Sequence, residues 1–260
     1  MKKRILQLIQ LILVGVILFS GYRIVDYFWQ RKRSDDQFSA VNKSIQEFQQ
    51  MTPKEDGNKN EKQDNKTVDY RGMMARLKET NADSIGYIDI AGTECQYPVV
   101  LGPDNDYYLY RGLDEEWSIQ GTPFLDVANQ PNLSDRNTVI YAHMMYTGET
   151  MFSSLRHFLE QEYTDTSPKT FTITNEEGVH HYRIIAAYRV SADAAYRTPN
   201  PSDEEWLPFL KETYQNSTTK FCEMPEFQMT DRIVTLSTCT PEHDASLRVA
   251  VVGLYEKTDK

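Results

Sequence analysis

The stretch that decides the fold runs over Thr235–Thr240 and reads T-L-S-T-C-T. Together with the preceding Val234, its apolar and polar side chains alternate with a period of two. Such alternation is typical of a half-buried strand that has one apolar and one polar face. Cys239 ends the polar face, and Pro241 follows closely and stops strand pairing. The pattern therefore predicts a strand whose last polar side chain is a thiol beside a loop.

A thiol at the open end of a strand is accessible, which makes Cys239 a candidate nucleophile. The alternative is a structural cysteine, because free cysteines in proteins are more often buried as small apolar residues. The stretch by itself leaves both interpretations open.

Charge divides the chain into two parts. The 260 residues carry a net charge of −10, yet residues 1–33 hold seven Lys or Arg and one acid. The remainder therefore carries 21 bases and 37 acids, a net charge of −16. A domain this acidic lacks the clustered bases that nucleic acids require, so no nucleic-acid partner is expected. Its length suits one domain of ordinary size.

The cysteine count argues against a metal site. There are three cysteines, with no C-x-x-C spacing, and none lies near His180-His181 in sequence. Zinc ligation is therefore unsupported, and no metal or cofactor is expected. An odd count leaves at least one free thiol. A Cys95–Cys222 disulfide is possible, but nothing in the sequence argues for it.

The amino terminus predicts a membrane anchor with basic flanks over residues 1–33. Ile5–Tyr22 is apolar except for two glutamines and barely spans a hydrocarbon core. A cleaved signal peptide is the alternative, but the run is long and no A-x-A-like site follows it. Basic residues flank both ends, so charge counting does not fix the orientation. The short tail and acidic domain favour a single-pass protein of the cell membrane with a cytoplasmic amino terminus and an extracellular domain.

Residues 34–66 are predicted to form a helix and a polar stalk. Ser34 is the expected helix start, and Thr52–Lys66 is polar and without periodicity. Residues 67–260 are then predicted to form the main domain, which opens with a helical pattern over Thr67–Thr80.

From Ala82 onward the pattern is mostly β, with peripheral helices. Short strands are predicted at Ile85–Ile90, Tyr97–Leu101, Thr122–Asp126, Asn137–His143, Lys169–Thr174, His180–Val190, Arg232–Cys239 and Leu247–Tyr255. Ser202 is expected to cap a helix that ends near Asn216, between late strands. Many short strands at close spacing indicate a closed or nearly closed β-barrel.

Two further residues can complete a site around Cys239. The last two strands form a predicted hairpin across Thr240–Ser246, which would bring Arg248 opposite Cys239 in a permitted register. A cysteine nucleophile needs a proton donor and charge at the developing oxyanion. His143, at the polar end of its strand, can supply the first, and Arg248 the second.

Each of these residues also has a structural alternative. His143 could be a hydrogen-bonded histidine at a strand end, and Arg248 could form a surface ion pair with Asp244. His243 is a weaker rival base in the acidic turn.

Taken together, T-L-S-T-C, the Arg that follows and the strand-end His that precedes it resemble the signature of sortases, the membrane-anchored cysteine transpeptidases of Gram-positive bacteria. Tyr141-Ala-His143-Met-Met and the run D-N-D-Y-Y-L at 104–109 resemble class B members in particular. The helices before the first strand and between late strands agree with this class. The resemblance covers roughly Thr67–Tyr255.

The resemblance implies an eight-stranded sortase-type barrel with Cys239, His143 and Arg248 around a groove. It implies that Cys239 cleaves a carboxy-terminal sorting signal after Thr through a thioacyl enzyme. The substrate would then be joined to an amino group of a peptidoglycan cross-bridge or, in some members, of a pilin. The same matching gives Asn105, Tyr141 and Ser237 as substrate-binding residues and Asp244 as a supporting residue.

Two other functions are weighed against this one. A papain-like wall peptidase usually has Cys before His and places Cys at a helix amino terminus, whereas here His143 precedes a strand-end Cys239. A non-catalytic, membrane-anchored binding domain would be favoured by loss of a site residue, yet all three are present.

Overall fold

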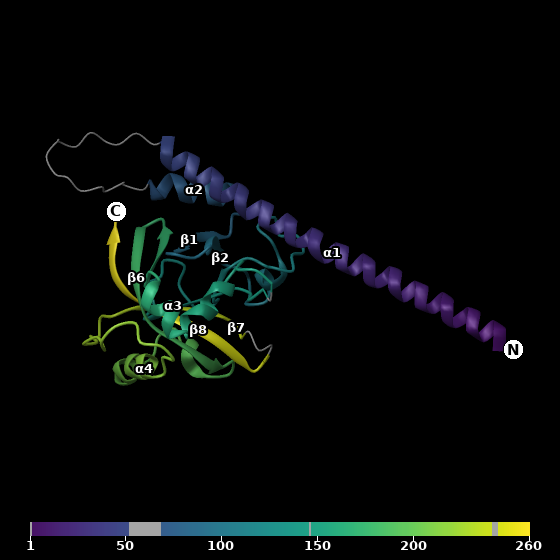
Figure 1. Ribbon diagram of the computed structural model, residues 1–260. Coiled ribbons are helices and arrows are strands. Elements are labelled where there is room, and N and C mark those ends of the chain that lie inside the picture. Colours follow the sequence, from purple (N-terminus) through teal and green to yellow (C-terminus); the bar gives the residue numbers. More distant parts are fainter. Residues whose placement is uncertain (1, 52–68, 146, 241–243) are drawn as a thin grey trace.

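A closed β-barrel dominates the structure (Figure 1). The computed structural model describes residues 2–51, 69–145, 147–240 and 244–260. Within these residues the barrel has eight strands: β1 (Ser84–Ile90), β2 (Gln96–Val100), β3 (Phe124–Leu125), β4 (Asn137–Tyr141), β5 (Thr170–Asn175), β6 (Gly178–Ser191), β7 (Ile233–Cys239) and β8 (Leu247–Asp259). Their order around the barrel is β1-β2-β3-β4-β7-β8-β6-β5. The predicted barrel with peripheral helices is confirmed.

The barrel is of mixed type, and two of its pairings are parallel. β2 pairs with β3 and β4 pairs with β7 in parallel, while the other neighbours are antiparallel. A parallel neighbour brings the carboxyl ends of β4 and β7 to the same edge. β4 ends at Tyr141, two residues before the predicted end, so His143 lies just beyond the strand. By contrast, β8 is longer than predicted and continues past Tyr255 to Asp259.

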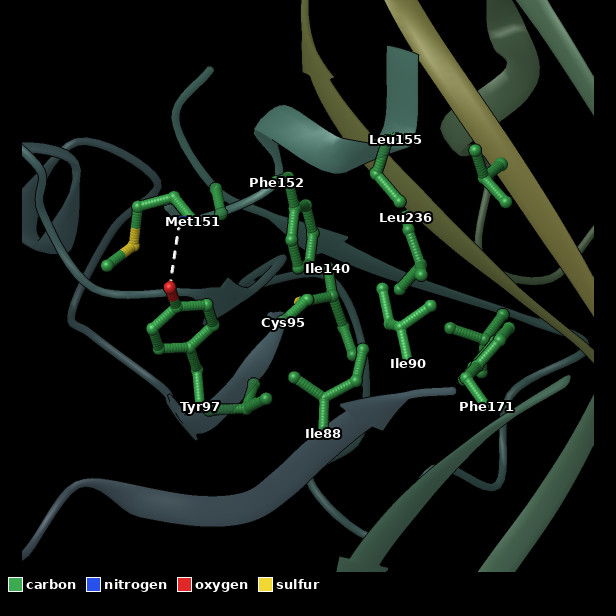
Figure 2. Packing of buried hydrophobic residues seen from close by; sticks show 14 of the residues in the cluster. Ile88, Ile90, Cys95, Tyr97, Ile140, Met151, Phe152, Leu155, Phe171 and Leu236 are labelled. Atoms are coloured by element: carbon green, nitrogen blue, oxygen red, sulfur yellow. Dashed lines mark hydrogen bonds between the residues drawn. The ribbon is translucent and has the colours of Figure 1, made fainter. Parts of the chain in front are cut away.

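The barrel interior is filled by aliphatic and aromatic side chains from nearly every strand (Figure 2). Ile88, Ile140 and Leu236 have no exposed surface, and Phe171 has almost none. The 3₁₀ helix η2 (Ser153–Leu159) adds Phe152 at its cap and further apolar side chains against the same core. This packing fixes the two segments that flank η2, including the segment that carries His143.

A second apolar layer lies on the outer face of β6, β7 and β8, where α4 (Asp203–Gln215) packs. Trp206 and Leu210 of α4 are fully buried there. Ser202 forms a capping box with Glu205, so the predicted helix and its cap are confirmed. Ile233 at the start of β7 belongs to this layer, and the residues of β7 are buried until the strand reaches Cys239 at its carboxyl end.

At the amino terminus, the predicted helix start at Ser34 is wrong. A single helix, α1, runs without interruption over Lys2–Met51. Ser34 is 3% exposed, and its Oγ lies 2.7 Å from the Oγ of Ser118. The hydroxyl therefore bonds to the connection between β2 and β3 and does not cap a helix. Phe38 and Ile45 continue the same face of α1 and are buried against the barrel side.

The first half of α1 projects away from the barrel (Figure 1). Its apolar side chains from Ile5 to Trp29 are exposed. By length and composition, α1 is the one helix among the described residues that could cross a membrane.

A shorter helix, α2 (Tyr70–Thr80), lies beside the end of α1 (Figure 1). Asp69 caps it by accepting a hydrogen bond from the Gly72 N–H, so the helix begins three residues after the predicted start at Thr67. The predicted stalk over Thr52–Lys66 lies outside the described residues. Both helices contact the barrel, so the polar segment connects two docked helices.

Candidate active site

Cys239 and Arg248 are direct partners in the β7–β8 ladder. Directly paired residues of an antiparallel ladder project to the same face of the sheet. Both side chains are partly buried, and Cys239 is the last residue of β7. The register that the hairpin permitted is therefore the one observed. It places a thiol and a guanidinium side by side at the rim of the barrel.

His143 reaches this rim through the parallel pairing of β4 and β7. Tyr141 pairs with Ser237, and the Ala142 N–H donates to the Ser237 carbonyl at 3.2 Å. His143 lies two residues after Tyr141, and Cys239 lies two residues after Ser237. Since neighbouring strands lie about 4.8 Å apart, the pairing brings both residues to the same end of the barrel.

The imidazole of His143 is held by the connection between β2 and β3. Its Nε2 lies 2.7 Å from the carbonyl oxygen of Leu109, and its ring centroid lies 5.2 Å from that of Tyr110. A carbonyl only accepts, so Nε2 carries the proton and donates it. Nδ1 is then the nitrogen that can exchange a proton with a ligand. Burial lowers the pKa of His143 below its usual 6.5, and the bond to Leu109 opposes this shift.

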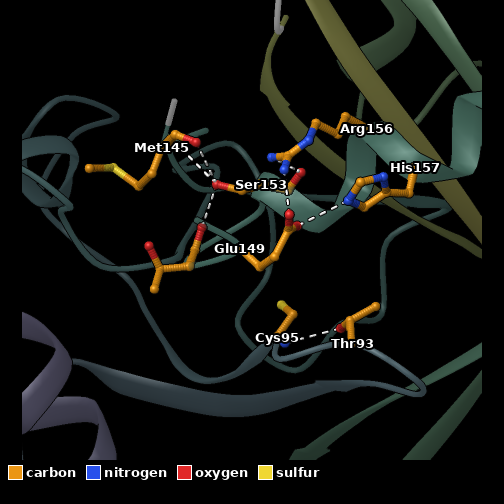
Figure 3. Close-up of polar contacts among 8 residues, drawn as sticks. Thr93, Cys95, Met145, Glu149, Ser153, Arg156 and His157 are labelled. Carbon is orange, nitrogen blue, oxygen red and sulfur yellow. Dashed lines mark hydrogen bonds and ion pairs between the residues drawn. The ribbon is translucent and has the colours of Figure 1, made fainter. Parts of the chain in front are cut away.

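The loop that follows His143 is held by its own hydrogen bonds (Figure 3). Ser153 Oγ accepts from the Met145 N–H at 2.8 Å. The carboxylate of Glu149 pairs with Arg156 and accepts from Nε2 of His157 at 3.2 Å. The Phe152 N–H donates to the His143 carbonyl at 3.0 Å, which closes the loop.

The turn between β7 and β8 orients the guanidinium of Arg248. Its Nη1 donates to the carbonyls of Ala245 and Leu247 at 2.9 and 2.7 Å. Arginine has five N–H donors, so these bonds leave three for a ligand. Asp244 accepts from the backbone and hydroxyl of Ser246, and these bonds lower the pKa of its exposed carboxyl. No ion pair between Asp244 and Arg248 occurs among the described residues, and His243 lies outside them.

The three predicted substrate-binding residues occupy different settings. Tyr141 is partly buried and donates to Asp126 at 2.6 Å. Ser237 is 1% exposed, and its Oγ lies 2.9 Å from the hydroxyl of Tyr196. Asn105 lies on the β2–β3 connection and accepts from the Val127 N–H at 3.0 Å. Tyr141 and Ser237 are ladder partners beside the rim, whereas Asn105 belongs to a loop bonded to the segment after β3.

Sequence reasoning missed several residues around this rim. Leu109 acts through its backbone carbonyl, which no side-chain pattern indicates. Tyr110 follows it directly and contacts His143. Burial and the bond to Asp126 raise the pKa of Tyr141, and the nearby guanidinium of Arg197 opposes this rise. Arg197 lies far from Tyr141 in sequence, so only the fold brings them together.

The other two cysteines are also free thiols. Cys95 is fully buried, and burial raises its pKa, which makes this thiol a poor nucleophile. Cys222 accepts from Arg183 at 3.3 Å on the opposite side of the sheet from Cys95, against the α4 layer. Across the described part of the chain, no group of three or more His, Cys, Asp or Glu side chains could hold a metal ion.

Comparison with known proteins gives consistent similarities. A family model described as Sortase domain matches residues 88–256. Sortase B of Listeria monocytogenes is 30% identical over 237 residues, which cover 90% of this chain and 89% of that protein. Sortase B of Staphylococcus aureus is 28% identical over 254 residues, 96% of each.

A solved structure shows the same fold. The Staphylococcus aureus sortase B–substrate complex matches with a TM-score of 0.74 and 24% identity, covering 89% of this chain and 100% of that one. The similarity therefore includes the amino-terminal helices as well as the barrel.

Proposed function

Because the chain belongs to the sortase family and resembles its class B members, which are cysteine transpeptidases, we propose that it cleaves a carboxy-terminal sorting signal after Thr. The released acyl group would be joined to an amino group of the cell wall. The observation that carries this proposal is the facing pair of Cys239 and Arg248, with His143 brought to the same rim by the β4–β7 register.

In the first step, the thiolate of Cys239 attacks the carbonyl carbon of the signal's Thr and forms a C–S bond. The carbonyl oxygen takes up the electron pair and becomes an oxyanion. Arg248 faces the thiol and is anchored by only one of its nitrogens, so its remaining N–H groups can stabilise this oxyanion.

In the second step, the tetrahedral intermediate collapses and the C–N bond breaks. His143, in its imidazolium form, donates the Nδ1 proton to the departing amine, while Nε2 remains bonded to Leu109. The product is a thioacyl enzyme. An amine acceptor then attacks the thioester, loses a proton to His143 and releases Cys239.

We assign the predicted residues accordingly. His143, Cys239 and Arg248 are catalytic, and Tyr141, Ser237 and Asn105 lie along the substrate groove. Of these, Ser237 is 1% exposed and bonded to Tyr196, so its assignment rests on the resemblance to sortases. Asp244 supports the reaction by holding the turn that carries Arg248.

We further assign residues 1–33 to a membrane anchor and residues 67–260 to the catalytic domain, with the amino terminus in the cytoplasm. Basic residues flank both ends of the apolar run, but two on the barrel side have structural partners. Arg31 bonds to Thr147 and Arg33 pairs with Asp114. Arg31 and Arg33 therefore have a structural reason to be basic. The structure describes no such partner for the basic residues at positions 2–4, so we take them as the cytoplasmic side under the positive-inside rule.

The test uses the full chain in detergent micelles, mixed with a panel of sorting-signal peptides with and without triglycine. Mass spectrometry should show a thioacyl adduct on Cys239 and, with the amine, ligation after Thr. The Cys222→Ala variant is the control: it should form the same adduct, which shows that the partly buried thiol of Cys222 is not the acylated group.

Each outcome decides between the candidate functions. Hydrolysis that is insensitive to the amine would indicate a different thiol peptidase. Ligation to a lysine-containing pilin peptide in place of triglycine would indicate pilus assembly. A folded protein that forms no adduct with any peptide would contradict the transpeptidase proposal and favour a binding domain.

A further inference from the structure

Helix α1 contacts both segments that hold His143, and we propose that it positions this histidine. The inference rests on the proposed role of His143 as proton donor. The residues that transmit the effect are Trp117 and Arg31, neither of which belongs to the predicted site. In this view the membrane helix is part of the active-site scaffold as well as an anchor.

The first contact runs through two stacked aromatic rings. The rings of Tyr110 and Trp117 lie 5.2 Å apart and nearly parallel, at 8°. Tyr110 also contacts the His143 ring, at 5.2 Å between centroids. Trp117 donates its Nε1–H to the Oε1 of Gln30 at 3.0 Å. A continuous path therefore joins α1 to the imidazole: Gln30, Trp117, Tyr110, His143.

The turn that bears this aromatic pair is docked on α1 over two helical turns. Ser34 bonds to Ser118, which follows Trp117 directly. Gln37 donates to Asp114 at 2.6 Å, and Arg33 pairs with the same carboxylate. The carbonyl of Leu109, which holds Nε2 of His143, belongs to the residue directly before Tyr110 in the same connection. Shifting the turn would therefore move both contacts of the imidazole.

The second contact reaches the loop that follows His143. Arg31 Nη1 donates to Thr147 Oγ1 at 2.5 Å. The neighbouring Gly148 has φ +88°, and a Cβ there would lie 2.4 Å from Arg31 Nη2. The loop thus approaches the guanidinium as closely as a glycine permits. The Met144–Met151 bridge closes this loop directly after His143, and Arg31 holds Thr147, which lies between the two bridge residues.

This arrangement predicts a large effect from residues that touch no substrate. Displacement of a catalytic group by about 1 Å can cost up to about 100-fold in rate. Trp117 and Tyr110 are 60% and 42% exposed, so the stack contributes little to the core. Losing it should change the orientation of His143 far more than the stability of the barrel.

The experiment compares Trp117→Ala, Trp117→Phe and Arg31→Ala in the full chain. Trp117→Phe keeps a ring on Tyr110 but loses the bond to Gln30, so it should fall between wild type and Trp117→Ala. Lys43→Ala is the matched control, because Lys43 is an exposed residue of α1 whose partner is Glu47 on the same helix. Two readouts are taken: kcat and KM for peptide acylation, and the rate of His143 carbethoxylation by diethyl pyrocarbonate.

We expect Trp117→Ala and Arg31→Ala to lower kcat about 10-fold with KM within about 2-fold of wild type. His143 carbethoxylation should rise relative to that of His181, an internal reference on β6. Unchanged kcat and unchanged His143 reactivity in both variants would overturn the proposal, as would an equal change in Lys43→Ala. If Trp117→Ala does not fold, the outcome is decided by Trp117→Phe and Arg31→Ala.

The two readouts also separate this inference from the proposed function. Carbethoxylation needs no substrate, so it tests the positioning of His143 even if no peptide is turned over. A wild-type protein that forms no thioacyl adduct would contradict the proposed function alone. Normal wild-type turnover with no response in the variants would contradict the positioning role alone.

Discussion

Cys239 and Arg248 face each other across the β7–β8 ladder, so one short hairpin presents both the thiol and the guanidinium. Their relative position is fixed by backbone pairing and needs no long-range docking of separate elements. The third residue, His143, depends on a parallel neighbour strand and on a distant carbonyl. The positions of Cys239 and Arg248 are therefore set by one ladder, whereas the position of His143 depends on contacts with other segments.

Cys239→Ala should abolish acylation by every sorting-signal peptide, because neither remaining cysteine lies at the rim. Cys95 is fully buried and Cys222 packs against the α4 layer. The measurement is adduct formation by mass spectrometry, with Cys222→Ala as the folded, active comparison. Residual turnover by the Cys239→Ala protein would remove this thiol from its proposed role.

Arg248→Lys should lower kcat/KM by more than about 10-fold, which corresponds to more than about 1.4 kcal/mol of transition-state stabilisation. A lysine ammonium has three N–H donors on one nitrogen and no planar fork, so keeping the two turn carbonyls as partners would leave it one donor for an oxyanion, where arginine has three. Arg183→Lys is a matched control on the barrel surface, where the arginine pairs with Glu256. Near-normal turnover by Arg248→Lys would contradict the assignment.

The strands were predictable because they are short apolar runs, the best of them with period-two patterning as in residues 233–239, and the final hairpin allowed only a few registers. The amino-terminal boundary was not predictable. Ser34 followed by two acids is typical of a helix start, but here its hydroxyl bonds to Ser118, 84 residues away. Local capping chemistry was overridden by a tertiary contact that leaves no trace in the local sequence.

The candidate site divides in the same way. Cys239, Arg248 and His143 carry side chains whose chemistry and order in sequence point to a nucleophile, a cation and a proton donor. What holds His143 is a backbone carbonyl and the ring of Tyr110, and both come from the β2–β3 connection, which is distant from His143 in sequence.

Phe38→Ala should destabilise the protein by about 3 kcal/mol, because this ring is 3% exposed and packs edge-on to Tyr97 at 5.1 Å. The matched control is Phe28→Ala, the same substitution on the same helix at a ring that is 62% exposed. Thermal unfolding of the full chain in detergent should show a lower midpoint for Phe38→Ala alone. Equal midpoints would mean that α1 does not stabilise the barrel.

Acidification should destabilise the protein partly through His180. This ring is 3% exposed and lies between Asn175 Oδ1 and Thr258 Oγ1, each at 2.8 Å. Burial lowers the pKa of His180 below 6.5, so the unfolded chain binds more protons than the native protein near that pH. The resulting stability is present above the unfolded pKa and is lost as the pH falls through it.

His180→Gln should therefore lose less stability than wild type between pH 7.5 and pH 5.5, since Gln does not titrate. Unfolding midpoints of both proteins at the two pH values provide the measurement. His143 shares the same direction of shift and is present in both proteins, so it cancels in the comparison. An identical acid-induced drop would exclude His180 as a contributor.

Gly121→Ala should impair catalysis beyond its effect on stability. Gly121 has φ +62°, and a Cβ there would lie 2.5 Å from the Leu109 carbonyl oxygen, the atom that accepts from His143 Nε2. The side chain would push this oxygen aside and release the imidazole.

Gly178→Ala is the matched control, because it has φ +141° and a Cβ would lie 2.4 Å from the carbonyl oxygen of Asp259, in the β5–β6 turn away from the rim. Both substitutions add a methyl group against backbone at a left-handed position, so both should lower the unfolding midpoint. Only Gly121→Ala should also lower kcat per folded molecule. We expect a loss of about 10-fold, since a shift of about 1 Å in a catalytic group can cost up to about 100-fold. Equal kcat in the two variants would show that the Leu109 carbonyl does not position His143.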